Sequence, residues 1–401
     1  MPLDRPVGDR RQGARRDAAR AADRRRGRGH QDPLGLPAGP ALRVTRRLAA
    51  CLLAAAALGA AGCRDTTNST STGGDTVTIY SVLPLEGPSA AAARDVADGE
   101  KLALRDANGQ AQGGKITVNF RSVDSTDDGR LTATSAARAA RTVAQDPSAV
   151  AAIGAFAASE ARIEIPLLNE AGVGLLSTAA TAVDLRDPSL FPSGRTTFSR
   201  LVGDDASQAR ALAAVARARG CRRLAVLAGS APEDRSLAAL VVRAAGARAR
   251  RAGLARAATV PRGACAVLAA SQAGPAARAA GVLPAARAVL APSALAGPAF
   301  ARALGSGGPA VTVLVADPQT PPAVAAAYAR TFGRRAATDA LLGYDAMRAV
   351  LSAIARAGPH GNDRAAVAAQ LQRTAPARWT TATVRGGRVV GARPKAPTFE
   401  P

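Results

Sequence analysis

The stretch KITVNFRSVDSTDDGRLTATSAARAARTVAQDPSAVAAIGAF (residues 115–156) contains a strand, a helix and a second strand in direct succession. Residues 115–124 are rich in β-branched and apolar side chains, which favours a strand. Residues 131–145 repeat apolar side chains at helical spacing, and residues 149–156 form the short apolar run of a buried strand. Two strands joined by a helix predict a parallel pair with a crossover helix.

The same alternation extends over the rest of the chain from residue 76. It predicts further strands at 76–85, 173–181, 222–230, 255–260, 265–271, 288–293 and 310–317, and helices at 94–108, 159–171, 205–219, 235–252 and 322–357. Strand segments without polar alternation indicate sheets that are buried on both faces. Because the pattern restarts after residue 200, we expect an α/β protein with two parallel-sheet domains, each covered by helices on both faces.

Arginine dominates the charge of the chain. The formal net charge is +23 and the isoelectric point is about 11.5, while the only lysines are Lys101, Lys115 and Lys395. Such a charge is typical of proteins that bind acidic polymers. The arginines are scattered through the predicted helices, however, and the 3% of aromatic residues do not interleave with them as base stacking requires. We therefore predict no nucleic-acid partner and interpret the charge mostly as solvated surface.

Residues 44–62 have the order of a secretion signal. Two arginines precede an apolar stretch at 48–59, and small residues follow at 60–62. The apolar stretch is about half of the ~20 residues that a membrane-spanning helix needs. Cys63 follows directly, and the arrangement resembles a bacterial lipobox in which that cysteine is lipidated, although Ala60 stands where leucine is usual. Ordinary secretion without a lipid is the alternative.

The segments on either side of this signal are polar. Residues 63–75 are predicted to be a flexible tether, and residues 1–43 contain too few apolar side chains to form a core. Because a secretion signal should begin a chain, residues 1–43 are interpreted as a mis-annotated extension or a disordered basic arm. We expect an exported protein, anchored to the outer face of the cytoplasmic membrane through Cys63.

Several segments keep the order and spacing of one protein family. They are VLPLEGPSAAAARDVADGEKLALRDANGQ (82–110), VDSTDD (123–128), DPSAVAAIGAFAASEA (146–161), PLLNEAGVGLLSTAATAVDL (166–185), TFSRLVGDDASQARALA (197–213), RRLAVLAGS (222–230) and YARTFGRRAATDALLGYDAMRAVLSAIARAG (328–358). In these segments the chain resembles the type I periplasmic binding proteins. More narrowly, it is similar to the leucine/isoleucine/valine-binding-like substrate-binding lipoproteins of ABC transporters.

The resemblance implies two Rossmann-like lobes joined by a multi-strand hinge. Lobe I would comprise residues 76–199 and 321–376, and lobe II residues 200–320 and 377–398. A small organic ligand, such as a branched-chain amino acid, an amide or a related compound, would lie between the lobes of a monomer and pass to an ABC permease. Strand carboxyl ends and helix N-termini, with their unpaired N–H groups, would face that ligand.

Ligand contacts of the family transfer to three positions of lobe I. Ser159 and Thr181 would bind a ligand carboxylate, together with the backbone of Ala179. A helix N-cap is the alternative role for Ser159, because serine is a preferred capping residue, and a plain turn residue is the alternative for Thr181.

Three further positions depart from the family pattern. Ser89 stands where an aromatic residue is common, Glu233 stands at about the place of a tyrosine, and Ser293 stands where an acidic residue usually pairs with the amino group of the ligand. An ammonium group buried without a counter-charge costs several kcal/mol of desolvation. A free amino acid therefore fits only if Glu233 provides the negative charge; a solvated loop carboxylate is the other interpretation of Glu233.

Cys221 directly precedes the first predicted strand of lobe II, and Cys265 opens the third. In a doubly wound sheet of order 2-1-3 these strands are neighbours, so both cysteines would lie at its amino-terminal edge. An exported protein meets an oxidising environment, and we predict a disulfide between them. Two buried thiols are the alternative.

The chain lacks the sequence motifs of common enzymes. It has no G-x-S-x-G, H-E-x-x-H or G-x-x-x-x-G-K-[ST], and its only histidines are His30 and His360. We predict no catalytic site, no metal site and no cofactor. A ligand-sensing or protein-interaction lipoprotein of the same fold, without a transport role, is the alternative to a transport receptor.

Overall fold

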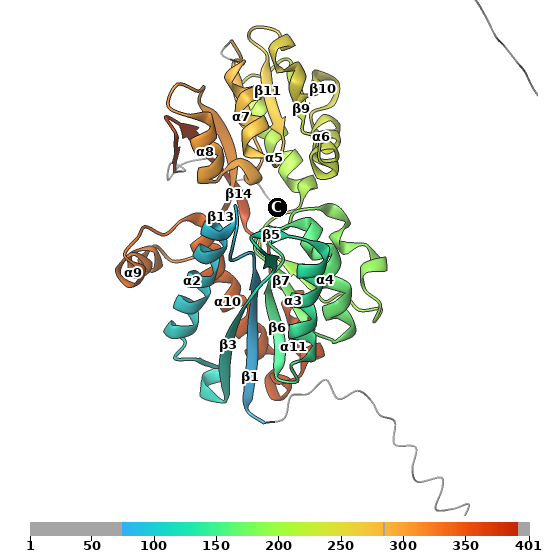
Figure 1. The fold of residues 1–401 in the computed structure, drawn as a ribbon, viewed down its shortest axis with the longest axis vertical. Helices are drawn as coiled ribbons and strands as arrows, with labels where there is room; N and C mark the ends of the chain where they lie inside the picture. The colour runs from blue at the N-terminus through green and yellow to red at the C-terminus, as the bar shows by residue number, and fades with distance from the viewer. Residues whose placement is uncertain (1–73, 284, 392–401) are drawn as a thin grey trace, which may run out of the picture. The chain divides into compact units, whose positions relative to one another are not determined.

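A computed structural model describes residues 74–283 and 285–391. The predicted N-terminal extension, signal peptide, Cys63 and most of the tether therefore lie outside the described residues. The described strands form two large sheets and one two-stranded ribbon, which consists of β4 (Thr126–Asp127) and β5 (Arg130–Leu131). We call the elements around the first large sheet lobe I and those around the second lobe II (Figure 1).

The lobe I sheet has six strands. Their order is β2 (Gln110–Ala111), β3 (Ile116–Asp124), β1 (Thr76–Leu83), β6 (Ala149–Gly154), β7 (Gly174–Ser177) and β8 (Phe198–Arg200). All pairs are parallel except the short β2–β3 pair. β3 and β6, the two strands within residues 115–156, are parallel as predicted, but each pairs with β1, which lies between them.

Helices cover both faces of this sheet because its strands are apolar on both sides. One face packs against α2 (Ala90–Asp106), α10 (Thr338–Arg356) and α11 (Arg364–Leu371). The other packs against α3 (Ala133–Gln145) and α4 (Ala158–Glu170). Successive strand residues alternate between the two cores: Ile79 faces the first and Tyr80 the second.

The lobe II sheet has seven strands. Their order is β10 (Ala249–Gly253), β9 (Leu224–Ala228), β11 (Cys265–Ala269), β12 (Ala288–Ala291), β13 (Val311–Asp317), β14 (Arg378–Arg385) and β15 (Arg388–Val390). The first five are mutually parallel, and β14 and β15 run antiparallel at one end. Helices α5 (Asp205–Ala218) and α6 (Pro232–Ala245) cover one face, and α7 (Ala273–Gly281) and α8 (Pro298–Leu304) cover the other.

Two expectations about the elements are wrong. The strand predicted at 255–260 is a 3₁₀ segment, Leu254–Thr259, and the strand of this region is β10 at Ala249–Gly253. The shift arises because α6 ends early at Gly246, whose φ of 68° is disfavoured for other residues. The helix predicted at 322–357 is divided in the same way, since the left-handed Gly333 separates α9 (Pro322–Phe332) from α10.

The chain passes between the two sheets three times, which is the multi-strand connection that the resemblance implies. The passages lie after β8, after β13 and before β14. The first and third run side by side: the Ala377 N–H donates to the Leu201 carbonyl at 2.6 Å, and Val202 pairs with Ala377. Near this point the fully buried indole of Trp379 donates from Nε1 to Ser207 Oγ at 2.8 Å.

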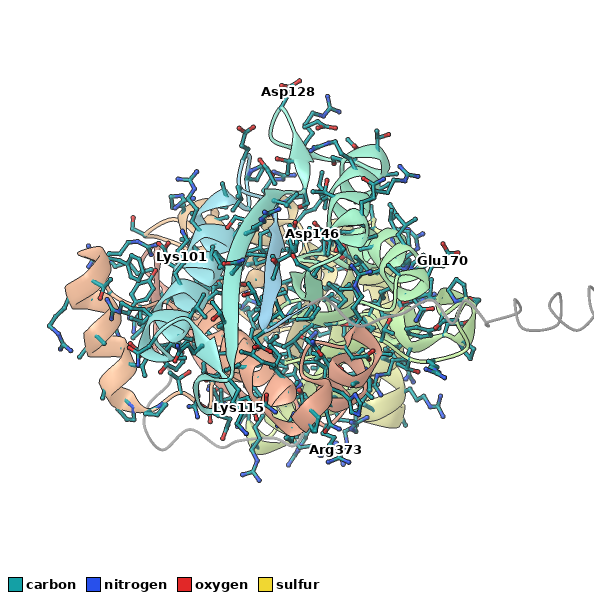
Figure 2. All side chains as sticks on the ribbon, turned by 90° about the horizontal axis from the view of Figure 1, so that it is seen from below. Lys101, Lys115, Asp128, Asp146, Glu170 and Arg373 are labelled. Atoms are coloured by element: carbon teal, nitrogen blue, oxygen red, sulfur yellow. A yellow bond between two sulfur atoms is a disulfide. The ribbon has the colours of Figure 1, made fainter. Side chains whose placement is uncertain are left out.

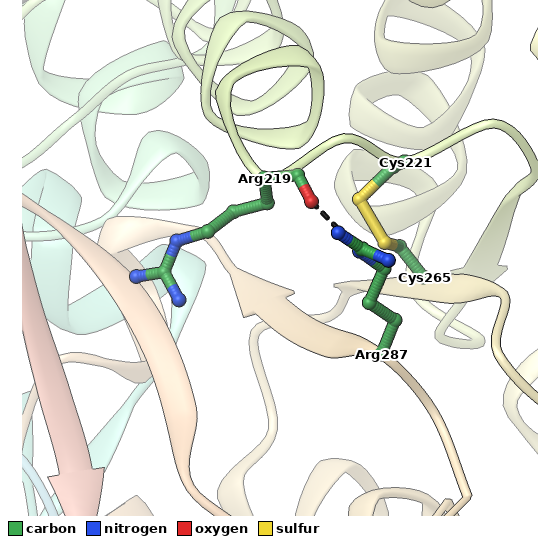
Figure 3. The surroundings of a disulfide bond; sticks show 4 residues. All are labelled: Arg219, Cys221, Cys265 and Arg287. Atoms are coloured by element: carbon green, nitrogen blue, oxygen red, sulfur yellow. Dashed lines mark hydrogen bonds between the residues drawn. A yellow bond between two sulfur atoms is a disulfide. The ribbon is translucent and has the colours of Figure 1, made fainter.

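The predicted disulfide between Cys221 and Cys265 is present, with 5.7 Å between the Cα atoms. Cys265 opens β11, and the register pairs it with Leu224 at the start of β9. Both cysteines therefore lie at the amino-terminal edge of the lobe II sheet, as the strand order requires (Figure 3). Among the described residues, every helix is too short or too polar to cross a bilayer.

Candidate functional site

The turn after β7 is fixed by Ser177, which stands directly before the predicted ligand residues. The Ser177 hydroxyl donates to the Ala155 carbonyl at 2.8 Å and accepts from the Ala179 and Ala180 N–H groups at 3.2 and 2.9 Å. Ala155 has a φ of 56°, which is unusual for a residue with a side chain. These bonds connect the loops after β6 and β7 and place Ala179 and Thr181, both half-buried, at the carboxyl end of the lobe I sheet.

A chain of polar contacts links Thr181 to Ser293 across the two lobes. The Asp205 N–H donates to the Thr181 carbonyl at 2.7 Å. Gln208 then donates from Nε2 to Asp205 Oδ1 at 3.0 Å. Its Oε1 accepts from the N–H and the hydroxyl of Ser293 at 3.0 and 2.9 Å. Two predicted ligand residues are thus joined through two residues that the sequence analysis did not identify.

Asp205 is the centre of this chain, and its environment favours the neutral form. Burial raises the pKa of its carboxyl, although hydrogen bonds from Thr181 and Gln208 and the charge of Arg200 oppose the shift. Arg200 is itself only 7% exposed at the end of β8. Its Nη1 donates to the Ala182 carbonyl at 3.1 Å, and its guanidinium lies 5.2 Å from the centre of the Phe198 ring.

Arg162 provides a second positive charge beside the turn after β7. It binds Asp184 through two hydrogen bonds of 2.7 and 3.0 Å, which hold the pKa of the Asp184 carboxyl below its ordinary value. The charges of Glu233 and Asp205 also act on Arg162 and, after Asp184, raise the pKa of its guanidinium. Glu233 is exposed in the first turn of α6.

Asp234, next to Glu233, is the buried carboxylate of the same helix turn. It is 4% exposed, and burial raises its pKa although hydrogen bonds from Ser271 oppose the shift. The Asp234 carboxylate fills the space beside Gly229, where a Cβ would lie 2.1 Å from Oδ2. Asp234 therefore packs against the loop after β9, a role that is structural.

Ser159 is not the N-cap of α4, which corrects that alternative. The cap is Ala157, and Ser159 is exposed in the first turn of the helix. The capping contact comes from Glu160, whose Oε2 accepts from the Phe156 and Ala157 N–H groups at 2.6 and 3.2 Å. Because Glu160 occupies these backbone donors, the Ser159 hydroxyl remains available at the positive end of the helix.

Ser89 is the N-cap of α2, but its side chain makes no capping hydrogen bond. An aromatic residue, Phe156, approaches the first half of α2 from the loop after β6. Phe156 packs with Leu85 against the cluster that Leu83 forms with the first half of α2. The signal that could have identified Phe156 was its position two residues after the buried strand at 149–154.

Two pockets lie away from these residues. One of about 760 Å³ is bounded by Asn169, Arg195 and Arg364, and the other, of about 350 Å³, by arginines that precede β9 and flank β10. Both lie where strands begin, whereas Thr181 and Ser293 lie where strands end. Within residues 74–283 and 285–391 there is no group of three or more His, Cys, Asp or Glu side chains that could hold a metal ion.

Comparisons with known proteins agree on the fold. Residues 98–272 match the family described as the receptor family ligand binding region. No curated protein matches the sequence. Among solved structures, a leucine binding protein from Thermotoga maritima is 20% identical, with a TM-score of 0.65, over 81% of this chain and 99% of the other.

Two further solved structures show the range of ligands that such folds hold. A branched-chain amino acid transporter substrate binding protein from Streptococcus pneumoniae, in complex with isoleucine, is 15% identical with a TM-score of 0.65 and covers 81% of this chain and 100% of the other. An ABC transporter solute binding protein from R. palustris, in complex with benzoate, is 14% identical with a TM-score of 0.62. The match covers 81% of this chain and 98% of the other. The chain has the type I periplasmic binding protein fold.

Proposed function

We propose that the protein is an extracytoplasmic solute-binding protein that captures a small organic ligand between its lobes for an ABC importer. The observation that carries the proposal is the polar chain Thr181–Asp205–Gln208–Ser293. It brings residues from the carboxyl ends of both sheets together beside the passages between the lobes. A ligand that exchanged hydrogen bonds with this chain would contact both lobes and would stabilise one arrangement of them over others.

The charges near this chain favour a ligand with a carboxylate. Arg200, Arg162 and the N-terminus of α4 with Ser159 are positive, and a carboxylate is the group that such positions stabilise. Glu233 is the exposed acid beside them that could pair with an amino group. A branched-chain amino acid, an amide or an aromatic acid all satisfy this description. Anchoring through a lipid on Cys63 and delivery to a membrane permease belong to the same proposal.

The alternative function is a sensing or protein-interaction lipoprotein of the same fold. One observation favours it: the hydroxyl of Ser293 is already hydrogen-bonded to Gln208. A side chain that is satisfied within the protein gains less from a ligand than an unpaired one.

A thermal-shift screen distinguishes the two functions. The full chain is melted with leucine, isoleucine, valine, their amides, short peptides and benzoate. A ligand at 100 times its Kd stabilises the folded state by about 2.7 kcal/mol, which raises the melting temperature by several degrees. We expect Thr181→Ala to abolish this rise, whereas the control Thr142→Ala, on the exposed side of α3, keeps it. A rise that survives Thr181→Ala, or no rise with any compound, contradicts the proposed site.

A further inference from the structure

Positive charge is concentrated in lobe II. Residues 201–320 and 377–391 contain 18 arginines against five carboxylates, whereas residues 74–200 and 321–376 contain 19 basic and 18 acidic residues. Both signs occur over lobe I in Figure 2, where Lys115 and Arg373 are labelled together with Asp146 and Glu170. A codon preference for arginine would act on both lobes alike. The asymmetry therefore belongs to the structure of lobe II.

The charges of lobe II are also separated along its strands. Asp204, Asp205, Glu233, Asp234 and Asp317 all lie where a strand ends or the next helix begins, and no aspartate or glutamate occurs from residue 235 to residue 316. At the opposite, amino-terminal edge of the sheet, the charged residues that the structure describes are all arginines. A field of one sign over such an edge attracts ions of the other sign.

A pocket of about 350 Å³ lies at this edge and is lined by four arginines. Arg222 and Arg223 directly precede β9, while Arg248 and Arg250 lie just before and within β10. All four side chains are exposed. Arg250 donates to the carbonyls of residues 247 and 249, both at 3.0 Å. Among the described carboxylates, none forms an ion pair with Arg222, Arg223 or Arg248.

The neighbouring disulfide holds this edge together (Figure 3). It joins the residue before Arg222 to the first residue of β11, so the start of β9 cannot separate from its neighbour. Arg287 lies beside it and donates from Nε to the Arg219 carbonyl at 2.8 Å, which directs a further guanidinium along the same edge. The arginines thus occupy a fixed frame and not a mobile tail.

Helix dipoles do not explain these arginines. A cation in the last turn of a helix is stabilised by the negative helix end, and Arg217, Arg243 and Arg278 occupy such positions. Arg222 and Arg223 instead follow the end of α5 by several residues, and Arg248 follows the end of α6. Like charges gathered around one pocket repel each other, and an anion between them removes that cost.

We propose that the amino-terminal edge of the lobe II sheet binds a linear phosphate polyanion, with single phosphate groups entering the arginine pocket. Guanidinium groups bind phosphate through paired hydrogen bonds. The arginines extend beyond the pocket to Arg219 and Arg287, which fits a chain of phosphates better than one ion. The described aromatic residues of lobe II, Phe300 and Trp379, are both buried, so contact is with phosphates and not with stacked bases.

A membrane surface is the competing partner. A bilayer presents a plane of headgroups, whereas these arginines line a concave pocket, which suits a phosphate that projects from a chain. Besides the arginines, three alanines, Pro261 and the buried Leu224 line the pocket, and they offer little apolar surface to insert into lipid. The chemistry at this edge therefore favours a soluble polymer.

The test is binding of the full chain to fluorescently labelled inorganic polyphosphate at several salt concentrations. If about four phosphates are neutralised, affinity falls by about two orders of magnitude between 50 and 200 mM salt. We expect Arg222→Gln/Arg223→Gln/Arg248→Gln to weaken binding at least tenfold. The control Arg141→Gln/Arg330→Gln/Arg335→Gln removes the same charge from exposed positions of lobe I and should change affinity less than twofold. The arginines of residues 1–66 are common to all variants, so the difference measures the pocket.

Three results would overturn the proposal: equal losses in the two triple variants, no binding of polyphosphate, or binding only to phosphatidylglycerol vesicles. Melting curves of both variants ensure that a loss is not caused by unfolding. Competition then identifies which natural polymer binds. Displacement of the labelled polyphosphate by poly(glycerol phosphate) or by duplex DNA supports phosphate recognition and shows which of the two polymers binds. If neither polymer displaces it, the proposal is contradicted. The outcome is independent of whether the proposed solute site binds a ligand.

Discussion

Glu100 is a fully buried carboxyl in the core of lobe I, and its removal should stabilise the protein at neutral pH. It lies on α2 and faces the sheet near Ser81. Burial raises the pKa of Glu100 from 4.5 to about 8, against the smaller opposing effects of the Ser81 hydroxyl and Lys101. The perturbation is Glu100→Gln, which keeps the size of the side chain and removes the proton equilibrium.

The magnitude and its sign follow from proton linkage. Between pH 4.5 and about 8 the folded protein keeps the proton of Glu100 while the unfolded chain releases it. Unfolding is therefore favoured as the pH rises through this window, by about 1.4 kcal/mol for each unit. At pH 7 the wild-type protein should lose about 3 kcal/mol relative to pH 4.5 from this group alone. The Glu100→Gln variant should lack this loss.

The assay is urea unfolding of wild type and variant at pH 5, 6, 7 and 8. The difference in unfolding free energy between the two proteins should grow with pH, because contributions from other groups cancel in the difference. Glu170→Gln, at an exposed position of the same lobe, is the control and should give a constant difference. A constant difference for Glu100→Gln as well would refute the reasoning, since the buried carboxyl would then titrate at an ordinary pKa.

Three further changes test other parts of the fold. Replacing Cys221 and Cys265 by serine removes the disulfide between residues 44 positions apart. It should lower the unfolding free energy by about 2–4 kcal/mol in urea titrations. An unchanged urea midpoint would mean that the disulfide does not form. Gly343→Ala places a Cβ 2.1 Å from the Val96 carbonyl where α10 crosses α2, and should cost about 1–3 kcal/mol in thermal melts, unless the helices separate freely. Thr132→Ala removes the N-cap of α3 and should cost about 1 kcal/mol by the same measurement, whereas no change would mean that the cap is replaced by water.

The sequence predicted most of the fold because the local patterns agree with the global arrangement. Apolar runs mark strands buried on both faces, and the spacing of helices between them requires parallel order. The errors arose where one glycine decides the backbone: Gly246 ends α6 early and Gly333 divides the last long helical segment. Helical periodicity continues through both positions, so apolar spacing alone cannot detect the break.

The candidate site was predicted only in part, because sequence spacing does not show which polar side chains satisfy one another. Thr181 and Ser293 were identified by position, but Asp205 and Gln208, which connect them, lie one turn apart in a helix that reads as ordinary amphipathic surface. Gln208 is held by hydrogen bonds to Ser293, which lies 85 positions further along the sequence. Such a contact exists only after α5 and β12 have taken their places in lobe II.

The charge of the chain is distributed differently in the two lobes. Counted over the whole sequence, scattered arginines predict a solvated surface, and in lobe I that interpretation agrees with ion pairs such as Arg138–Asp127 and Arg121–Asp146. In lobe II the strand order gathers the starts of β9, β10 and β11 at one edge, so arginines distant in sequence become neighbours around one pocket. A charge that is diffuse along the chain is therefore concentrated by topology. The proposed solute site at the strand ends and the arginine edge at the strand starts both follow from the parallel order of the strands.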